Sequence, residues 1–493
     1  MRHLSAWDAA GSIVRAAISG ACGICLWRGC TQLWRSCWRP SGRRPRRERF
    51  VLRSVRSRQG GGSELPWAAV RVGLVTLPAG GHAMRRLRVA LSAQRASLRR
   101  GGGERYVLTV ARLLAEAGHQ VWLFAAQAEP AEWPAGVHFC QVPGLAVAGL
   151  RWLRAYHFAA NSERAIRRFG ADLVIGFDKT WYQDVLVAVG GAHPATLVSS
   201  GRRFRSAWGR GLWRAGKAAS PKQWVFRRIA DRQFRWHQPR VIAPSRMSAV
   251  HFQHYHGVPR EMIRVVYNAV DRDVTMADRA GLRVAVRRQW GLGDDEVAVL
   301  FAACNYSLKG LEPLLNAFAR LVPRASRARL VVCGSHHDRR YRRHAGRLGV
   351  AGRVVWLPYV EDMRRCYAAC DAFALPTFYD PCSLAVLEAM CAGLPAVTTR
   401  QNGASELIRH GVDGFVIPWP WATEELAGHL GRLVRDEPLR RGMAEEARRA
   451  GAAFTLEARR SEILEALVGD PHGRVAWPSR GAGTPVARAL AAG

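Results

Sequence analysis

Short apolar runs alternate with helical patterns along most of the chain. In the second half, an apolar run at 372–375 is followed by a break at 376–381, a helical pattern that starts at Ser383, and another apolar run at 396–399. Strand, loop, helix and strand in this order form the crossover unit of a parallel sheet. The pattern therefore predicts an α/β fold in this region.

The same alternation continues on both sides of this unit. With 493 residues, the chain is long enough for two domains with full hydrophobic cores. Three helical patterns follow residue 418, at 423–434, 439–452 and 456–468. Further apolar runs predict strands at 87–91, 119–124, 171–177, 241–245, 297–303, 329–334 and 354–357.

The two ends of the chain lack this pattern. Residues 1–83 show no sustained periodicity and include the basic run SGRRPRRERF, so we expect a disordered extension, or a protein whose translation starts at Met84; we prefer the second. The cysteines near Cys22 fit no strong zinc-binding spacing. Residues 469–493 are rich in Gly, Pro and Ala and are expected to form a flexible tail.

Charge narrows the range of partners. The chain has 74 Lys and Arg against 38 Asp and Glu, a net charge of +36, which favours an anionic partner such as a phosphorylated saccharide, a lipid surface or nucleic acid. Its 11 cysteines are scattered, which is typical of a reduced, cytoplasmic protein. Because no apolar run reaches 18 residues, we expect no transmembrane helix.

Residues 201–240 combine basic and aromatic side chains. The segment holds 12 basic residues, a single acid, Asp231, and Trp208, Trp213, Trp224 and Trp236. This mixture suits the headgroup layer of an anionic membrane, nucleic acid, or a plain solvated helix pair. Because four tryptophans are costly to leave in water, we favour contact with a membrane.

Candidate chemistry gathers around the helix that starts at Ser383. Asp380 and Glu388 are eight residues apart, so a loop carboxylate and one on the second helical turn can point to the same side. Between them, the amides of Ser383 and Leu384 form a helix N-terminus, which binds anions. A sugar nucleotide needs these groups, although a helix cap at Asp380 and a solvated Glu388 would explain the spacing as well.

The same stretch resembles a known family. Residues 378–395 (FYDPCSLAVLEAMCAGLP), followed by NGASE at 402–406 and GVDGF at 411–415, resemble the donor-site signature of retaining glycosyltransferases of family 4, and within it the lipopolysaccharide core glucosyltransferase I group. The family has Glu where this chain has Asp380. The resemblance implies a GT-B fold of two Rossmann-like domains that face a cleft, an acceptor domain at 84–275 and a donor domain at 276–468.

The resemblance also implies roles for residues outside this stretch. The segment SLRRGGGE at 97–104 resembles the family's glycine-rich donor loop, so the amides of Gly102 and Gly103 are expected at the diphosphate. Lys309, just before a predicted helix, is placed to neutralise the same group. Asn305 stands near the position of a family Arg, and the candidates to replace that cation are Arg100, Lys179 and Arg400.

Acceptor residues are expected beyond the strand at 171–177. Asp184 and His193 follow it, and by resemblance Asp184 falls where an acceptor-side acid sits; a helix cap and a turn histidine are the plainer interpretations. Glu388 is expected to hold the ribose, and Asp380 to orient the sugar hydroxyls. Asp271 and Asp273 lie in a loop context that argues against a metal site, and we assign no metal and no cofactor.

The implied function is transfer of a hexose with retention of configuration. The expected donor is UDP-glucose, and the expected acceptor is a lipopolysaccharide inner core at the cytoplasmic face of the inner membrane. One alternative is a family 4 transferase with another lipid-linked saccharide or an exopolysaccharide acceptor. Two others are a nucleotide-sugar epimerase and a basic nucleic-acid-binding protein, although we do not expect nucleic acid as the partner.

Overall fold

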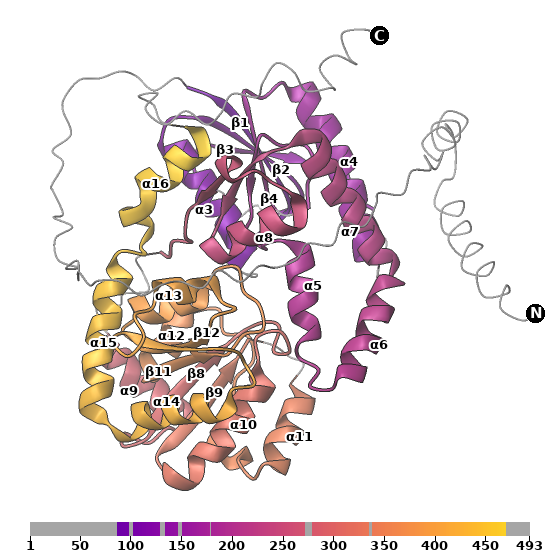
Figure 1. The fold of residues 1–493 in the computed structure, drawn as a ribbon. Helices are drawn as coiled ribbons and strands as arrows, with labels where there is room; N and C mark the ends of the chain where they lie inside the picture. The colour runs from indigo at the N-terminus through magenta and orange to yellow at the C-terminus, as the bar shows by residue number, and fades with distance from the viewer. Residues whose placement is uncertain are drawn as a thin grey trace, which may run out of the picture. The chain divides into compact units, whose positions relative to one another are not determined.

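The computed structural model describes residues 86–97, 102–128, 134–145, 150–177, 179–271, 279–334 and 338–469. The predictions for residues 1–83 and for the tail after Gly469 lie outside these ranges, as does Arg100. Two parallel sheets with their helices account for the described chain (Figure 1).

The first sheet has seven strands in the order β3-β2-β1-β4-β5-β6-β7. Every pairing in it is parallel, and Val89 of β1 lies opposite Val121 on one side and Leu173 on the other. The strands are β1 (Arg88–Ala96), β2 (Gln120–Ala128), β3 (Val137–Gln141), β4 (Leu173–Phe177), β5 (Val185–Val187), β6 (Arg240–Ala243) and β7 (Ile263–Val265).

The helices of this half cover both faces of the first sheet. Because side chains alternate along a strand, Val89 and Leu91 pack on the side of α3, whereas Ala90 packs on the side of α4. The helices are α3 (Gly102–Glu116), α4 (Arg151–Phe169), α5 (His193–Gly201), α6 (Ala207–Ala218), α7 (Pro221–Asp231), which continues as a π-helix (Arg232–His237), and α8 (Arg246–His256).

The second sheet has six parallel strands in the order β10-β9-β8-β11-β12-β13. These are β8 (Val297–Ala302), β9 (Ala328–Cys333), β10 (Val354–Trp356), β11 (Ala372–Leu375), β12 (Ala396–Thr399) and β13 (Gly414–Ile417). The helices in this half of the sequence are α9 (Arg279–Trp290), α10 (Leu311–Leu321), α11 (Arg339–Arg347), α12 (Met363–Ala369), α13 (Leu384–Cys391), α14 (Thr423–Arg435), α15 (Glu437–Ala452) and α16 (Leu456–Val468).

The last helix, α16, belongs by packing to the first sheet. Its side chains Ile463, Ala466 and Leu467 are buried in the same cluster as α3 and β1. Val270 forms a parallel bridge with Thr455 just before this helix. The chain therefore crosses from one sheet to the other twice, between β7 and α9 and again near 453–455.

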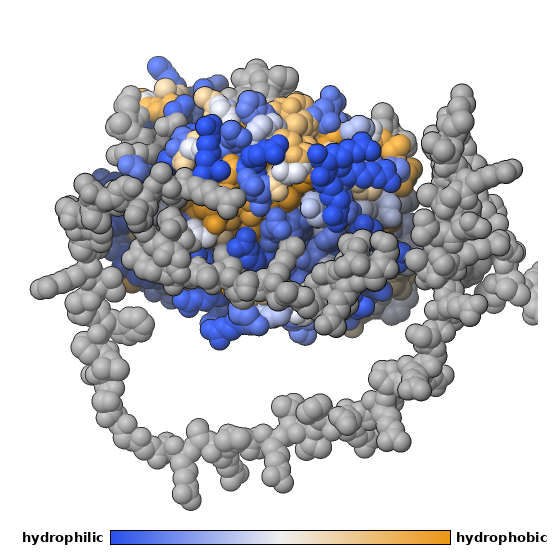
Figure 2. All heavy atoms as spheres, turned by 90° about the horizontal axis from the view of Figure 1, so that it is seen from above, coloured by the Kyte–Doolittle hydropathy of each residue, from blue (hydrophilic) through white to orange (hydrophobic). Residues whose placement is uncertain are grey.

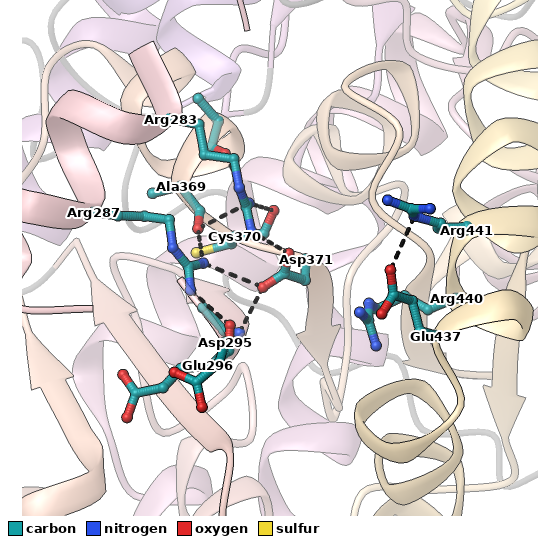
Figure 3. A network of polar contacts seen from close by, with 12 residues as sticks. Arg283, Arg287, Asp295, Glu296, Ala369, Cys370, Asp371, Glu437, Arg440 and Arg441 are labelled. Atoms are coloured by element: carbon teal, nitrogen blue, oxygen red, sulfur yellow. Dashed lines mark hydrogen bonds and ion pairs between the residues drawn. The ribbon is translucent and has the colours of Figure 1, made fainter. Parts of the chain in front are cut away.

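A charged network fastens α9 to the second sheet (Figure 3). Arg283 and Arg287 point from α9 toward Asp371, which precedes β11 and also accepts the amide of Ala298 at 2.8 Å. Arg287 is only 2% exposed, and its Nη1 donates a hydrogen bond to the carbonyl of Ala369 at the end of α12. A second pair, Glu437 with Arg441 on α15, lies apart from this group in the same view.

The prediction of a parallel α/β fold is confirmed in both halves. The longer strands and the helices after residue 418 lie within a few residues of their predicted ranges. Sequence reasoning missed the strands β3, β5, β7 and β13, which have three to five residues each. Length alone does not explain this, because β6, β10, β11 and β12 are as short and were predicted.

Candidate active site

A cavity of about 550 Å³ lies between α3 of the first half and α12 and α13 of the second. It lies at the carboxyl ends of the strands, because α3 follows β1 and α13 follows β11. Its walls combine two helix N-termini with charged side chains of both signs. Among the lining residues are Gly102, Arg105, Thr109, Arg112, Asp271, Glu361, Arg364, Tyr367, Leu384 and Glu388.

Two helices begin at this cavity. α3 starts at Gly102 and α13 at Leu384, and a Cβ atom on Gly102 would lie 2.8 Å from Leu384 Cδ1. Only glycine therefore fits this approach without a shift of the leucine. The first amides of each helix have no acceptor within their own helix, and the helix dipoles add positive potential there. Gly102 and Leu384 therefore lie together at this cavity, and their binding of an anion stays a prediction.

Gly103 and Ser383 lie next to this contact, and for Ser383 the prediction was wrong. Gly103 is the second residue of α3, and a Cβ there would lie 3.4 Å from Val189 Cγ1. The amide of Ser383 donates to Asn402 Oδ1 at 3.1 Å, and the residue is buried. The side chain of Asn402 accepts the amide of Ala404 as well. Because its proton is already used inside the protein, the Ser383 amide is not available to a ligand.

Glu388 lies on the second turn of α13 and lines the cavity. The hydroxyl of Tyr367 donates to Glu388 Oε2 at 2.6 Å. Burial, together with the adjacent carboxylate, raises the pKa of Tyr367 well above its ordinary value. The tyrosine therefore stays protonated and holds one carboxylate oxygen, while the carboxylate as a whole faces the cavity. Sequence reasoning did not find Tyr367, because the contact joins two different helices.

Asp380 and Lys309 form an ion pair, with Lys309 Nζ donating to Asp380 Oδ2. Asp380 is buried in the loop before α13, and the amide of Gly403 donates to its carbonyl at 2.9 Å. Asp380 therefore does not cap α13. Neither residue is part of the cavity wall around Glu388.

The loop that carries Asp380 lies against the first half of the chain. A Cβ atom on Gly191, which has a φ of +66°, would lie 2.4 Å from the Tyr379 hydroxyl and 2.7 Å from Pro381 Cγ. Gly191 precedes His193, the first residue of α5. The structure therefore brings the neighbourhood of Asp380 and that of His193 together across the two sheets.

His193 lines a second cavity, of about 230 Å³. Its Nε2 atom lies 2.7 Å from Gln223 Oε1, and Lys179 and His256 share the cavity wall. Burial lowers the pKa of His193, so the ring is neutral at neutral pH. A neutral imidazole next to the loop of Asp380 can donate a hydrogen bond to a hydroxyl group or accept one from it.

The prediction for Asp184 was wrong. Asp184 does not follow a strand but precedes β5, so it lies at the amino edge of the sheet, away from the carboxyl edge where His193 lies. Its Oδ2 atom accepts the amide of Val174 at 2.9 Å, and its own amide donates to the carbonyl of Val174. This carboxylate fixes the start of two strands and is not placed to meet an acceptor.

The positions near Lys309 give only part of the expected positive charge. Asn305 Oδ1 accepts the amide of Leu308 at 3.2 Å, so this side chain shapes the turn before α10. Lys179 Nζ lies over the ring of Phe226 at 4.5 Å, in the second cavity. Arg400 is exposed after β12. The cation that replaces the family Arg therefore stays a prediction.

Polar contacts join the two halves beside the site. Ser245 Oγ donates to the carbonyl of Pro381 at 2.6 Å, and Asn268 Nδ2 donates to that of Cys382 at 2.7 Å. Glu406 accepts the amides of Arg246 and Met247, the first two residues of α8, at 2.9 and 2.8 Å. These contacts hold the loop that leads into α13. Of the residues that make these contacts between the halves, Glu406 alone was part of a motif noted in the sequence.

The basic segment 201–240 forms α6, α7 and the π-helix. Trp208 on α6, Trp224 on α7 and Trp236 are 81%, 71% and 66% exposed, and α6 has no buried residue. The expectation of four exposed tryptophans is wrong for Trp213, which packs against Gly201 and Phe204. None of the helices in the described chain is both long and apolar enough to cross a bilayer.

The face seen from above in Figure 2 mixes large hydrophilic areas with smaller hydrophobic ones. Within the described ranges, no group of three or more His, Cys, Asp or Glu side chains is arranged to hold a metal ion. Asp271 instead lies 3.6 Å from Arg112 across the rim of the main cavity. The described site is thus built from helix N-termini, carboxylates and cationic side chains.

Two Rossmann-like domains with a cavity at the carboxyl ends of their strands form a fold of the GT-B type. The chain belongs to the glycosyltransferases of family 4: the model "Glycosyltransferase Family 4" matches residues 100–274, and "Glycosyl transferases group 1" matches residues 283–450. The resemblance seen in the sequence is therefore confirmed, and so is the GT-B fold.

Individual proteins agree with this assignment. Lipopolysaccharide glucosyltransferase WaaG of Escherichia coli K12 is 25% identical over 360 residues, which cover 71% of this chain and 90% of WaaG. The crystal structure of WaaG has a TM-score of 0.66 at 21% identity, over 78% of this chain and all of that chain. Anabaena HepE in complex with UDP-glucose has a TM-score of 0.57 at 20% identity, over 78% of this chain and 99% of HepE.

A further relative matches a smaller part of this chain. An uncharacterized glycosyltransferase of Methanocaldococcus jannaschii is 30% identical over 184 residues, which cover 36% of this chain. The alignment spans 46% of that relative's length.

Proposed function

We propose that the protein transfers a hexose from a nucleoside diphosphate sugar, with UDP-glucose as the donor, to a lipid-linked saccharide, with retention of configuration. The observation that supports this most is the meeting of two helix N-termini, at Gly102 and Leu384, on the cavity that Glu388 lines. Two positive helix ends with a carboxylate nearby suit a diphosphate joined to a ribose.

The donor would extend from the main cavity toward Asp380. The ribose hydroxyls would donate to Glu388, whose orientation Tyr367 fixes. The diphosphate would take the amides of Gly102, Gly103 and Leu384 and the ammonium group of Lys309. Negative charge grows on the diphosphate as the bond to the sugar breaks, so these fixed positive groups stabilise the transition state more than the bound donor.

Binding of the donor would change the partner of Lys309. Without ligand, Lys309 is paired with Asp380. If a diphosphate attracts the ammonium group, the carboxylate of Asp380 becomes free to accept hydrogen bonds from sugar hydroxyls. One ion pair would thus supply both groups that the donor needs.

The acceptor would enter on the side of the second cavity. His193 lies there, neutral and hydrogen-bonded to Gln223, next to the loop of Asp380. We propose a lipopolysaccharide inner-core saccharide as the acceptor, since WaaG is a lipopolysaccharide glucosyltransferase and aligns over most of both chains. Transfer needs no metal or cofactor in this proposal.

A membrane surface would hold this acceptor. The exposed Trp208, Leu212 and Trp224 lie on α6 and α7 among basic residues that include Arg214 and Lys217. Indole rings favour the headgroup layer, and the basic side chains favour anionic lipids. We therefore propose peripheral binding of α6 and α7 to an anionic membrane, which for this acceptor is the cytoplasmic face of the inner membrane.

A transfer assay tests the proposed reaction. The full chain is mixed with UDP-glucose labelled with ¹³C at C1 and with vesicles that carry inner-core lipopolysaccharide, and the anomeric carbon is followed by NMR. We expect a new α-glucoside that forms only when the acceptor is present. Conversion of the donor without any acceptor would indicate an epimerase instead, and a β-glucoside would contradict retention.

A further inference from the structure

The turn between α5 and α6 brings arginine side chains to the second half of the chain. Figure 1 shows these two helices extending toward α10 and α11. Arg203, in the turn, donates from Nη1 to Ser307 Oγ at 3.0 Å, and Ser307 lies two residues before Lys309. The turn thus contacts the loop that carries the lysine assigned to the donor diphosphate.

A second guanidinium is linked to this loop through two tyrosines. Arg340 is exposed, lies over the ring of Tyr341 at 4.4 Å and donates from Nη2 to the Tyr341 hydroxyl. The ring of Tyr341 lies 5.6 Å from that of Tyr306, the residue before Ser307. Burial, followed by the positive charge of Arg340, lowers the pKa of the Arg203 guanidinium. Among the described residues, neither arginine forms an ion pair with a carboxylate.

This arrangement leaves positive charge without compensation. Arg203 is half-buried and its bond to Ser307 is to a neutral hydroxyl group. Burial and the positive charge of Arg340 both disfavour the charged form of Arg203 in the free protein. A bound anion removes that repulsion, and the planar donors of arginine match the oxygen atoms of a phosphate.

We infer that Arg203, Arg340 and Ser307 form a binding site for a phosphate group of the substrate, an inference that rests on the proposed transfer reaction. Two substrates can bring this group. It is a phosphate on the acceptor if the site is used together with a bound nucleotide, and it is the donor diphosphate if the nucleotide itself occupies the site. In the second case Arg203 supplies the cation that is missing near Asn305.

The matched control is Arg339, which is exposed and precedes Arg340 on the same helix. Arg339→Gln removes the same charge as Arg340→Gln, but it removes it from a side chain that lies outside the proposed contact. Arg203→Lys keeps the charge and removes the planar group of donors. Circular dichroism melting of each variant checks that the fold is intact.

The experiment is a ³¹P NMR titration of the full chain with inorganic phosphate at constant ionic strength, first alone and then with saturating UDP. We expect the wild type to bind phosphate, Arg203→Gln and Arg340→Gln to weaken binding about tenfold or more, and Arg203→Lys to fall between them and the wild type. Arg339→Gln is expected to bind as the wild type does.

The UDP arm identifies the source. Phosphate that stays bound with UDP present indicates the acceptor, whereas displacement by UDP, with weaker UDP binding in Arg203→Gln, indicates the donor. The inference is overturned if the wild type binds no phosphate, if the Arg203 and Arg340 variants bind as it does, or if Arg339→Gln weakens binding equally. Binding of UDP-glucose, measured on the same samples, tests the proposed function separately.

Discussion

Asp380 and Glu388 are separated by eight residues, yet they lie in different surroundings. Glu388 faces the main cavity with one oxygen held by Tyr367, whereas Asp380 is buried in an ion pair with Lys309. The first carboxylate is ready to accept hydrogen bonds from a ligand. The second becomes available only when the lysine turns to another anion, so the two acids differ in when they act.

His256 makes the free energy of unfolding depend on pH. His256 lines the second cavity and stacks on Phe234, with 4.3 Å between the ring centroids. Burial lowers the pKa of His256 to about 4. Between the ordinary value of 6.5 and about 4, the unfolded chain binds a proton that the folded chain does not. The free energy of unfolding therefore falls as the pH is lowered through this range.

We expect His256→Gln to make that decline less steep, by at most about 1 kcal/mol per pH unit. Urea unfolding of the wild type and the variant at pH 7 and pH 5 measures the difference. The control is His138→Gln, which changes an exposed histidine on the edge strand β3. Equal pH dependence in wild type and His256→Gln would contradict the effect of burial.

Sequence reasoning could identify residues whose position follows from local spacing. Glu388 and Leu384 were expected at one site because each lies at a fixed distance from a predicted helix start, and both line the cavity, whereas Lys309 lies outside its wall beside Asp380. Tyr367 was not found and Asn402 was seen only as part of a motif, since their contacts join segments about 20 residues apart. These residues orient the site, and only the tertiary packing brings them to it.

At the scale of elements, Asp371, just before β11, joins the helix α9 to the strand β8. It receives Arg283 and Arg287 from α9 and the amide of Ala298 from β8. Removal of this largely buried carboxylate leaves the buried Arg287 charged and without its acid. We expect Asp371→Ala to lower the free energy of unfolding by about 3 kcal/mol, measured by urea unfolding.

The control for this prediction is Asp295→Ala. Asp295 is largely exposed and lies 4.0 Å from Arg327, so its loss should cost less than ~0.5 kcal/mol. If both variants were destabilised equally, the ion pairs of Asp371 with Arg283 and Arg287 in Figure 3 would not be the cause.

The short strand β5 explains why the prediction for Asp184 failed. β5 has three residues, so its start could not be seen in the sequence, and Asp184 was placed after the preceding strand instead. The register with β4 then shows that this acid lies at the amino edge. The long strands and amphipathic helices were found, because a repeated pattern over many positions is a strong signal.

At the scale of the whole molecule, positive charge and exposed indoles lie on the same helices. We expect Trp208→Ser and Trp224→Ser each to weaken binding to vesicles of phosphatidylglycerol and phosphatidylcholine, on the order of tenfold. Binding should also weaken as salt is raised, because the basic residues act through the surface potential of the lipid. Sedimentation of the full chain with vesicles measures both effects.

Trp419→Ser is the matched control, because Trp419 is an exposed indole in the other half of the chain. Equal loss of binding in this variant would contradict a specific role for α6 and α7. Tighter binding to duplex DNA than to vesicles, lost in the Trp208 and Trp224 variants, would favour the nucleic-acid alternative.

The central claim is that the cavity between α3 and α13 binds a nucleotide sugar through Glu388. Saturation-transfer difference NMR of the full chain with UDP-glucose, UDP-galactose, UDP-N-acetylglucosamine and GDP-mannose tests it most directly, with Glu388→Ala beside the wild type. The account predicts binding of UDP-glucose and its loss in the variant. Binding of none of the four sugars, or equal binding by Glu388→Ala, would contradict it.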